Sequence, residues 1–76
     1  MIKLTRTDSS RNMRRFYALQ LATTLFGECV LIAEWGRIGS AGRVQEQVYP
    51  SPTQAQVALS KRLSVKIRRG YTVTSV

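Results

Sequence analysis

The segment from Ser51 to Gly70 carries a full set of helix signals, which the rest of the chain lacks. Ser51 suits an N-cap, Pro52 suits the first helical position, and Gln54 completes a capping box with Ser51. Gly70 suits the position just past a helix end. Apolar residues recur at helical spacing at Ala55, Ala58, Leu59, Leu63 and Ile67. The sequence therefore predicts one α-helix over about residues 52–69.

The other segments alternate apolar and polar residues, which is the pattern of a half-buried β-strand. We expect strands over residues 1–7, 15–24, 29–35, 43–49 and 71–75, a basic loop over 8–14, and a glycine-punctuated turn over 36–42. Short connections favour antiparallel neighbours. The sequence therefore predicts an α+β fold, an antiparallel sheet with one helix packed on one face, as a single domain of residues 1–76.

Alternation also assigns side chains to the two faces of each expected strand. The second strand places Tyr17, Leu19 and Leu21 on one face. The third and most apolar strand places Cys29, Leu31, Ala33 and Trp35 on one face and Val30, Ile32 and Glu34 on the other. We therefore expect the lone cysteine to be a small buried residue rather than a reactive thiol.

Charge narrows the range of functions. The chain has 12 Lys and Arg residues against 4 scattered Asp and Glu residues, a net charge of +8. The acids cannot neutralise this surplus, so a polyanionic partner is expected, nucleic acid above all. The chain has no His and no close pair of acids, and the glycines of 36–42 match neither a P-loop nor a dinucleotide fingerprint. We expect no catalysis, no cofactor and no metal site.

The N-terminus, the hydropathy and the single cysteine predict where in the cell the protein is found. The N-terminus lacks the apolar core of a signal peptide, and no apolar run reaches the length of a membrane span. A lone cysteine cannot form an intramolecular disulfide. We therefore expect a cytoplasmic protein with no membrane partner.

The strongest candidate site lies around Trp35 and Arg37, which flank Gly36. An indole can stack on a sugar or base, and a guanidinium can bind a phosphate. If the strand continues through Gly36 the two side chains lie on the same side, whereas a bend at the glycine separates them. Trp35 fits equally well as a residue that closes the core, because it shares a face with Leu31 and Ala33.

The remaining candidate contacts are arginines. The expected nucleic-acid-binding residues are Trp35, Gly36, Arg37, Arg43, Arg11, Arg14 and Arg15. For the arginines the alternative is a solvated surface charge. The basic residues of the helix have simpler explanations, since Lys61 and Arg62 suit a solvated face and Lys66, Arg68 and Arg69 complement the negative end of the helix dipole.

The stretch from Asn12 to Tyr71 resembles the WGR domain, a module named for its Trp-Gly-Arg sequence. The resemblance is carried in order by Phe16-Tyr17, Leu19-Gln20-Leu21, Gly27, Trp35-Gly36-Arg37-Ile38-Gly39, Gly42, Tyr49, Ser51, Ala55, Lys61, Lys66 and Gly70-Tyr71. It implies an antiparallel sheet with one helix. In the best-known members, the DNA-dependent poly(ADP-ribose) polymerases, the domain binds DNA near a break.

The resemblance implies roles for two residues. In those polymerases the motif Trp packs on the ribose at a DNA end, and the motif Arg contacts the backbone and relays the signal to neighbouring domains, which would be the roles of Trp35 and Arg37. The match does not include a polymerase catalytic domain, so it implies no ADP-ribosylation. Two positions depart from the family pattern, Glu34 where a basic residue is frequent and Arg43 where Gln is frequent.

A carboxylate at Glu34 would repel a phosphate at the motif unless alternation turns it to the opposite face. The leading hypothesis is a non-catalytic nucleic-acid-binding module that favours DNA ends or nicks. The alternative is a protein-interaction adaptor that docks an acidic partner.

Overall fold

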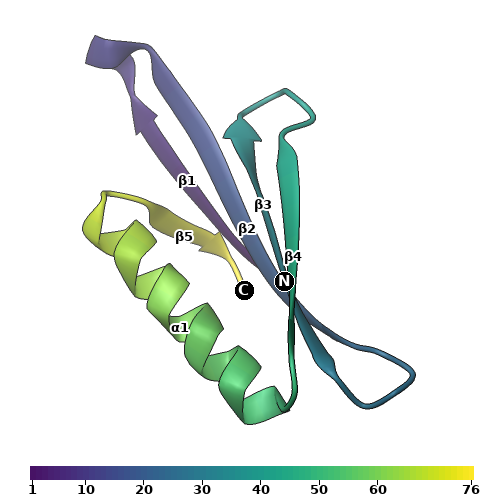
Figure 1. Cartoon of the computed structure of the whole chain (residues 1–76). Coiled ribbons are helices and arrows are strands. Elements are labelled where there is room, and N and C mark those ends of the chain that lie inside the picture. The colour runs from purple at the N-terminus through teal and green to yellow at the C-terminus, as the bar shows by residue number, and fades with distance from the viewer.

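The computed structural model describes residues 1–76 and shows an antiparallel sheet with a helix along one of its faces (Figure 1). In chain order the elements are β1 (Ile2–Asp8), a 3-10 helix (Ser9–Arg11), β2 (Met13–Thr23), β3 (Cys29–Arg37), β4 (Arg43–Tyr49), α1 (Pro52–Arg68) and β5 (Thr72–Ser75). The five strands are ordered β4-β3-β2-β1-β5, and every neighbouring pair is antiparallel. The predicted α+β architecture is confirmed.

The helix α1 begins and ends where its signals indicate. Ser51 is extended and its side chain accepts a hydrogen bond of 3.3 Å from the backbone N–H of Gln54. Beyond the last helical residue, Gly70 has a φ of 98°, the left-handed conformation that glycine adopts without a steric cost. No helix of the structure has the length and hydropathy needed to cross a membrane.

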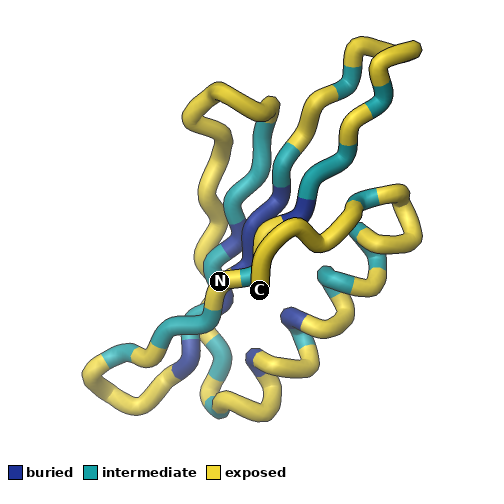
Figure 2. The backbone as a smooth tube through the Cα atoms, turned by 180° about the vertical axis from the view of Figure 1, so that it is seen from behind, coloured by how far each residue is buried: buried dark blue, intermediate teal, exposed yellow.

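The core lies between α1 and the inner face of the sheet, which is the face that the helix covers. It is built on Leu4, Tyr17, Leu19, Leu31, Ala33 and Leu59. Figure 2 shows buried residues in the middle of the sheet and on the facing side of the helix, and exposed residues at the hairpin turns. The predicted strand faces are confirmed, and Cys29 is buried as a free thiol.

Two predicted boundaries are wrong, and both corrections concern the candidate site. Residues 8–14 do not form a loop throughout, because a 3-10 turn is followed by the start of β2 at Met13. The strand expected to end at Trp35 continues through Gly36 to Arg37. It is held there because the N–H of Ile38 donates a 2.9 Å hydrogen bond to the carbonyl of Arg14.

The tight packing of two glycines explains why β3 continues in this way. A Cβ atom on Gly36 would lie 2.7 Å from the Cα atom of Gly42. A Cβ atom on Gly42 would lie 2.6 Å from the carbonyl oxygen of Trp35 and 2.8 Å from the ring of Phe16. The turn between β3 and β4 therefore folds closely over the Trp-Gly-Arg segment, and the glycine at 36 is required by this backbone contact.

One position of the predicted apolar stripe of α1 is also wrong. Ile67 is 49% exposed. The inner side of the helix continues instead from Leu59 through Arg62 and Lys66, which are half-buried. The helix therefore turns cationic side chains toward the sheet at its C-terminal end.

Candidate functional site

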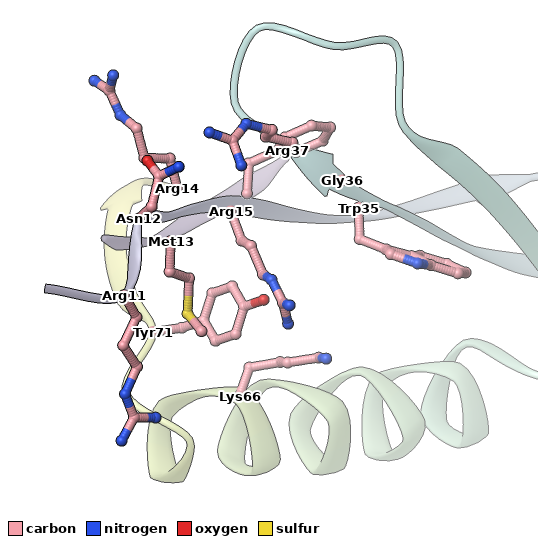
Figure 3. Close-up of a pocket in the computed structure, with 11 residues that line it drawn as sticks. Arg11, Asn12, Met13, Arg14, Arg15, Trp35, Gly36, Arg37, Lys66 and Tyr71 are labelled. Atoms are coloured by element: carbon pink, nitrogen blue, oxygen red, sulfur yellow. The ribbon is translucent and has the colours of Figure 1, made fainter. Parts of the chain in front are cut away.

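A pocket of about 460 Å³ opens where the ends of β2 and β3 face the last turns of α1 (Figure 3). It is lined by Arg11, Asn12, Met13, Arg14, Arg15, Phe16, Trp35, Gly36, Arg37, Lys66 and Tyr71. Five of these residues are Lys or Arg, and none is acidic. The lining therefore favours an anion, and its aromatic rings favour a flat group beside that anion.

The register of the sheet explains how these residues meet. Tyr17 pairs with Trp35 and Arg15 pairs with Arg37 across β2 and β3, and Arg43 on β4 also pairs with Trp35. Because directly paired residues share a face, all five occupy positions on the helix-covered side of the sheet. Of the two arrangements left open by the sequence, the structure has the continuous strand, with Trp35 and Arg37 at same-side positions.

Not all of these cations point to the same place. Figure 3 shows Arg15 and Lys66 pointing toward each other across the space between sheet and helix, beside Tyr71. The guanidinium of Arg37 instead stays near the end of β3, away from Lys66. The pocket therefore has a cationic centre made by Arg15 and Lys66 and a further cation at its rim.

The indole of Trp35 is half-buried and is supported from within the core. It stacks on Tyr17, with ring centroids 6.1 Å apart and ring planes 22° apart. Tyr17 also meets Tyr71 edge-on, with centroids 6.3 Å apart. Trp35 therefore packs against the core and still lines the pocket, so the two interpretations of this residue are compatible.

Lys66 is held in an unusual environment for a lysine. Its Nζ atom lies 4.5 Å from the centroid of the Tyr17 ring and 5.4 Å from that of Tyr71. Burial lowers the pKa of Lys66, and the charges of Arg69, Arg15 and Arg62 lower it further. No carboxylate offsets this cost, since the one ion pair of the structure is elsewhere. A bound anion would favour the charged form and restore the pKa.

Arg62 has a structural role that its sequence position does not suggest. The prediction of a solvated side chain is wrong, because Arg62 is half-buried and faces the sheet. Its guanidinium donates long hydrogen bonds to the hydroxyl of Tyr17 (3.5 Å) and to the side-chain oxygens of Gln45 and Gln47 (both 3.4 Å). It thereby links α1 to β2 and β4 and adds positive charge beside the pocket.

The three arginines around the start of the second predicted strand, Arg11, Arg14 and Arg15, do not point in the same direction. Arg15 points inward, whereas Arg14 occupies the opposite face of β2, and Figure 3 shows Arg11 and Arg14 directed away from the centre of the pocket. Arg11 pairs with Asp8 at 3.8 Å. A hydrogen bond from the hydroxyl of Ser10 lowers the pKa of Asp8, which keeps this carboxylate charged.

The carboxylate next to the motif tryptophan is directed away from the pocket. Glu34 pairs with Ala18 and Val44, so alternation places it on the outer face of the sheet, the face that α1 leaves bare. Glu46, which pairs with Ile32, lies on the same outer face. The two glutamates of the strands are therefore separated by the sheet itself from Arg15 and Lys66, the cations at the centre of the pocket.

These features define a small α+β domain with a cationic, aromatic-lined pocket at one end of its sheet. The chain belongs to the WGR domain family, whose sequence profile matches residues 1–75.

Comparison with known proteins adds one relative. The uncharacterized protein y4dW of Sinorhizobium fredii is 38% identical to this chain over 66 residues. The match covers 87% of this chain and 32% of y4dW, so the chain spans about a third of the length of that relative. No solved structure matches the chain significantly.

Sequence reasoning missed the residues that support the tryptophan. The sequence places Tyr17 only on a strand face with Leu19 and Leu21, and it explains Lys66 only by the helix dipole. The helical spacing was a signal that could have identified Lys66. It lies seven residues after Leu59 and three after Leu63, so it falls on the apolar side of the helix. A cation on the apolar side of a helix is the feature that identifies this site.

Proposed function

We propose that this WGR domain is a non-catalytic nucleic-acid-binding module that favours DNA, and that residues 1–76 act as one domain. Trp35 presents its indole to a sugar or base, while Lys66 and Arg15 bind the adjoining phosphate. Arg37 adds charge at the rim, Arg43 adds charge on the neighbouring strand outside the pocket, and Arg11 and Arg14 contribute at longer range. Gly36 acts indirectly, because it allows the turn to pack over the motif.

The observation that carries this proposal is the lysine at the centre of the pocket. A cation whose pKa is lowered by burial and by neighbouring arginines, with no carboxylate beside it, is stabilised by an incoming phosphate. An aromatic ring alone would suit many apolar ligands. Its position beside Lys66 and Arg15 matches the alternating flat and anionic parts of a nucleotide chain.

Ends and nicks are the form of DNA that this pocket suits best. Base pairs inside a duplex are stacked on both sides, so their flat faces are closed to an indole. At an end or a nick one such face is exposed next to a backbone phosphate. The recess beside Trp35 opens at one end of the sheet, where a strand terminus can enter it without the duplex crossing the sheet.

Fluorescence anisotropy with a labelled blunt duplex tests the proposal. We expect saturable binding that weakens steeply between 50 and 200 mM salt, since phosphate contacts release counterions. The double variant Trp35→Ala, Lys66→Gln should bind roughly 100-fold less tightly. A nicked or blunt competitor should displace the probe better than a covalently closed duplex of equal length.

Two results would contradict the proposal. One is the absence of binding at low salt, and the other is unchanged binding by the double variant. Displacement of the duplex by a polyglutamate peptide at equal charge would favour the adaptor function instead, because such a peptide offers charge without a sugar or base to stack.

A further inference from the structure

The outer face of the sheet carries many apolar side chains, whereas a sheet face exposed to water usually carries polar ones. Six aliphatic residues of β2, β3 and β4 lie on this face, of which only Ala18 is buried, namely Ala18, Ala22, Val30, Ile32, Val44 and Val48. Val44 and Val48 are 60% and 54% exposed. A sheet face in water normally alternates to polar residues. We call this surface of β2–β4 the outer patch; its composition is typical of a surface that binds another protein.

The outer patch also has a defined charge. Glu34 and Glu46 lie within it, and they are two of the four acidic residues of the chain. Lys3 on β1 is the cation that the strand pairing places closest to Glu34, because both residues pair with Ala18 on β2 from opposite sides. Lys3 and Glu34 form no ion pair. A partner for this patch should therefore offer apolar and basic side chains together.

This chain carries such a surface on the outward side of α1, opposite the core. A shallow groove of about 520 Å³ lies there, lined by Gln56, Val57, Ser60, Lys61, Ser64, Val65 and Arg68. The two serines leave room for close approach, and Val57 is 49% exposed. The whole helix contains no acidic residue. The outward side of α1 thus complements the outer patch in both polarity and charge.

The spacing of the charges agrees as well. Lys61 and Arg68 are seven residues apart, so they lie on one side of the helix about 10 Å apart along its axis. Glu34 lies opposite Val44 on the neighbouring strand, and Glu46 is two residues further along that strand. Strand geometry then places the two glutamates about 8 Å apart. Flexible lysine and arginine side chains span this difference.

We propose that the outer patch of one copy binds the outward side of α1 of a second copy. The two surfaces lie on opposite sides of the molecule, so the contact is head-to-tail and can be repeated by further copies. Each sheet in such a stack has a helix on both faces, a common layer arrangement. The Trp35 pocket lies between the inner face and α1, so it stays open in the stack.

The size of the contact sets its strength. A helix of 17 residues is about 25 Å long, so the contact lies at or below the roughly 1,200 Å² typical of stable complexes. The copies also repel one another through their net charge of +8. We therefore expect weak, reversible association of the free protein, observed at high concentration.

Sedimentation equilibrium of the full chain without nucleic acid, up to about 1 mM, tests this inference. The patch variant is Glu34→Lys, Glu46→Lys, and the helix variant is Lys61→Glu, Arg68→Glu. Each should associate at least roughly tenfold more weakly than the native chain, because like charges then meet at the contact. An equimolar mixture of the two variants should associate again, since each supplies the surface that complements the other.

The helix variant separates the contact from general repulsion. It lowers the net charge from +8 to +4, so repulsion alone would make it associate more strongly than the native chain. Glu28→Lys, a reversal at the exposed β2–β3 turn, serves as the control and should change association little. The reassociating mixture also shows that both variants are folded.

Three outcomes would overturn the inference. The first is a native chain that remains monomeric at 1 mM, the second is association that survives both reversals, and the third is a mixture that stays monomeric while both variants give native-like NMR spectra.

Discussion

The indole of Trp35 rests on the ring of Tyr17, with centroids 6.1 Å apart and planes inclined by 22°. Tyr17 is only 5% exposed and belongs to the core, so it connects the candidate site directly to the core of the fold. Lys66 lies over the same ring from the helix side. The aromatic surface and the cation of the pocket are therefore positioned by one buried residue before any ligand binds.

Removal of the indole should weaken both binding and folding. We expect Trp35→Ala to lower affinity for a blunt duplex by about tenfold or more, because stacking on one base is worth about 1–3 kcal/mol. Its stability should fall by about 1–3 kcal/mol, since a half-buried aromatic ring is lost. Anisotropy and urea unfolding measure the two effects. Trp35→Phe keeps an aromatic ring on Tyr17, so it should retain most of the affinity and most of the stability. If Trp35→Phe and Trp35→Ala lost the same affinity, stacking by the ring would be contradicted.

The contact between Gly36 and Gly42 predicts a steric effect. Gly36→Ala should destabilise the fold by about 3 kcal/mol, at the upper end of overpacking costs, because its new Cβ atom meets the Cα atom of Gly42 at 2.7 Å. Gly39→Ala is the control, since Gly39 has a φ of 94° but no atom within 4 Å of an added Cβ. It should cost about 1 kcal/mol for the left-handed backbone alone. Similar unfolding midpoints for the two variants would contradict the close approach.

The lowered pKa of Lys66 predicts how stability depends on pH. Below its folded pKa, Lys66 is charged in both states and the folded state bears the cost of burying that charge. As pH rises through the folded pKa toward the usual 10.5, the folded state loses its proton first and stability increases. The Lys66→Met variant buries no charge, so we expect it to be more stable than the native chain at pH 7. It also lacks the gain at high pH, so this difference in the free energy of unfolding should shrink between pH 7 and pH 10, as measured by urea unfolding. A difference independent of pH would contradict the assignment.

Salt dependence distinguishes a direct phosphate contact from general charge. Lys66→Gln should reduce the slope of log affinity against log salt by about 1, since one phosphate contact is lost. Lys3→Gln makes the same change of charge on the outer face of β1 and should leave the slope unchanged. Anisotropy titrations between 50 and 200 mM salt measure both. Equal slopes for the two variants would show that Lys66 acts only through net charge.

Local signals predicted much of the fold. The caps at Ser51 and Gly70 predict the bounds of α1, and alternation predicts the buried side of each strand because both depend on near neighbours along the chain. The strand order could not be predicted, since β5 joins β1 across almost the whole sequence. The extension of β3 through Gly36 was missed because it depends on where the backbone of Gly42 lies.

The candidate site was predictable only in part. The motif identifies Trp35 and Arg37 as neighbours, and the register of the sheet adds Arg43 by pairing it with Trp35. The central cation Lys66 reaches the tryptophan only because α1 packs across the sheet, a contact that no spacing within β3 contains. Arg14 and Arg15 separate because β2 begins earlier than its turn-rich sequence suggests.

The most direct measurement is a ¹H–¹⁵N NMR titration of the protein with a blunt DNA duplex, observing the indole N–H of Trp35. We predict that this signal shifts progressively and saturates, together with backbone signals of Arg15, Gly36 and Lys66. Signals of Val44 and Val48 on the outer face should change little at protein concentrations that keep the chain monomeric. An indole signal that stays fixed while the duplex binds would contradict the site described here.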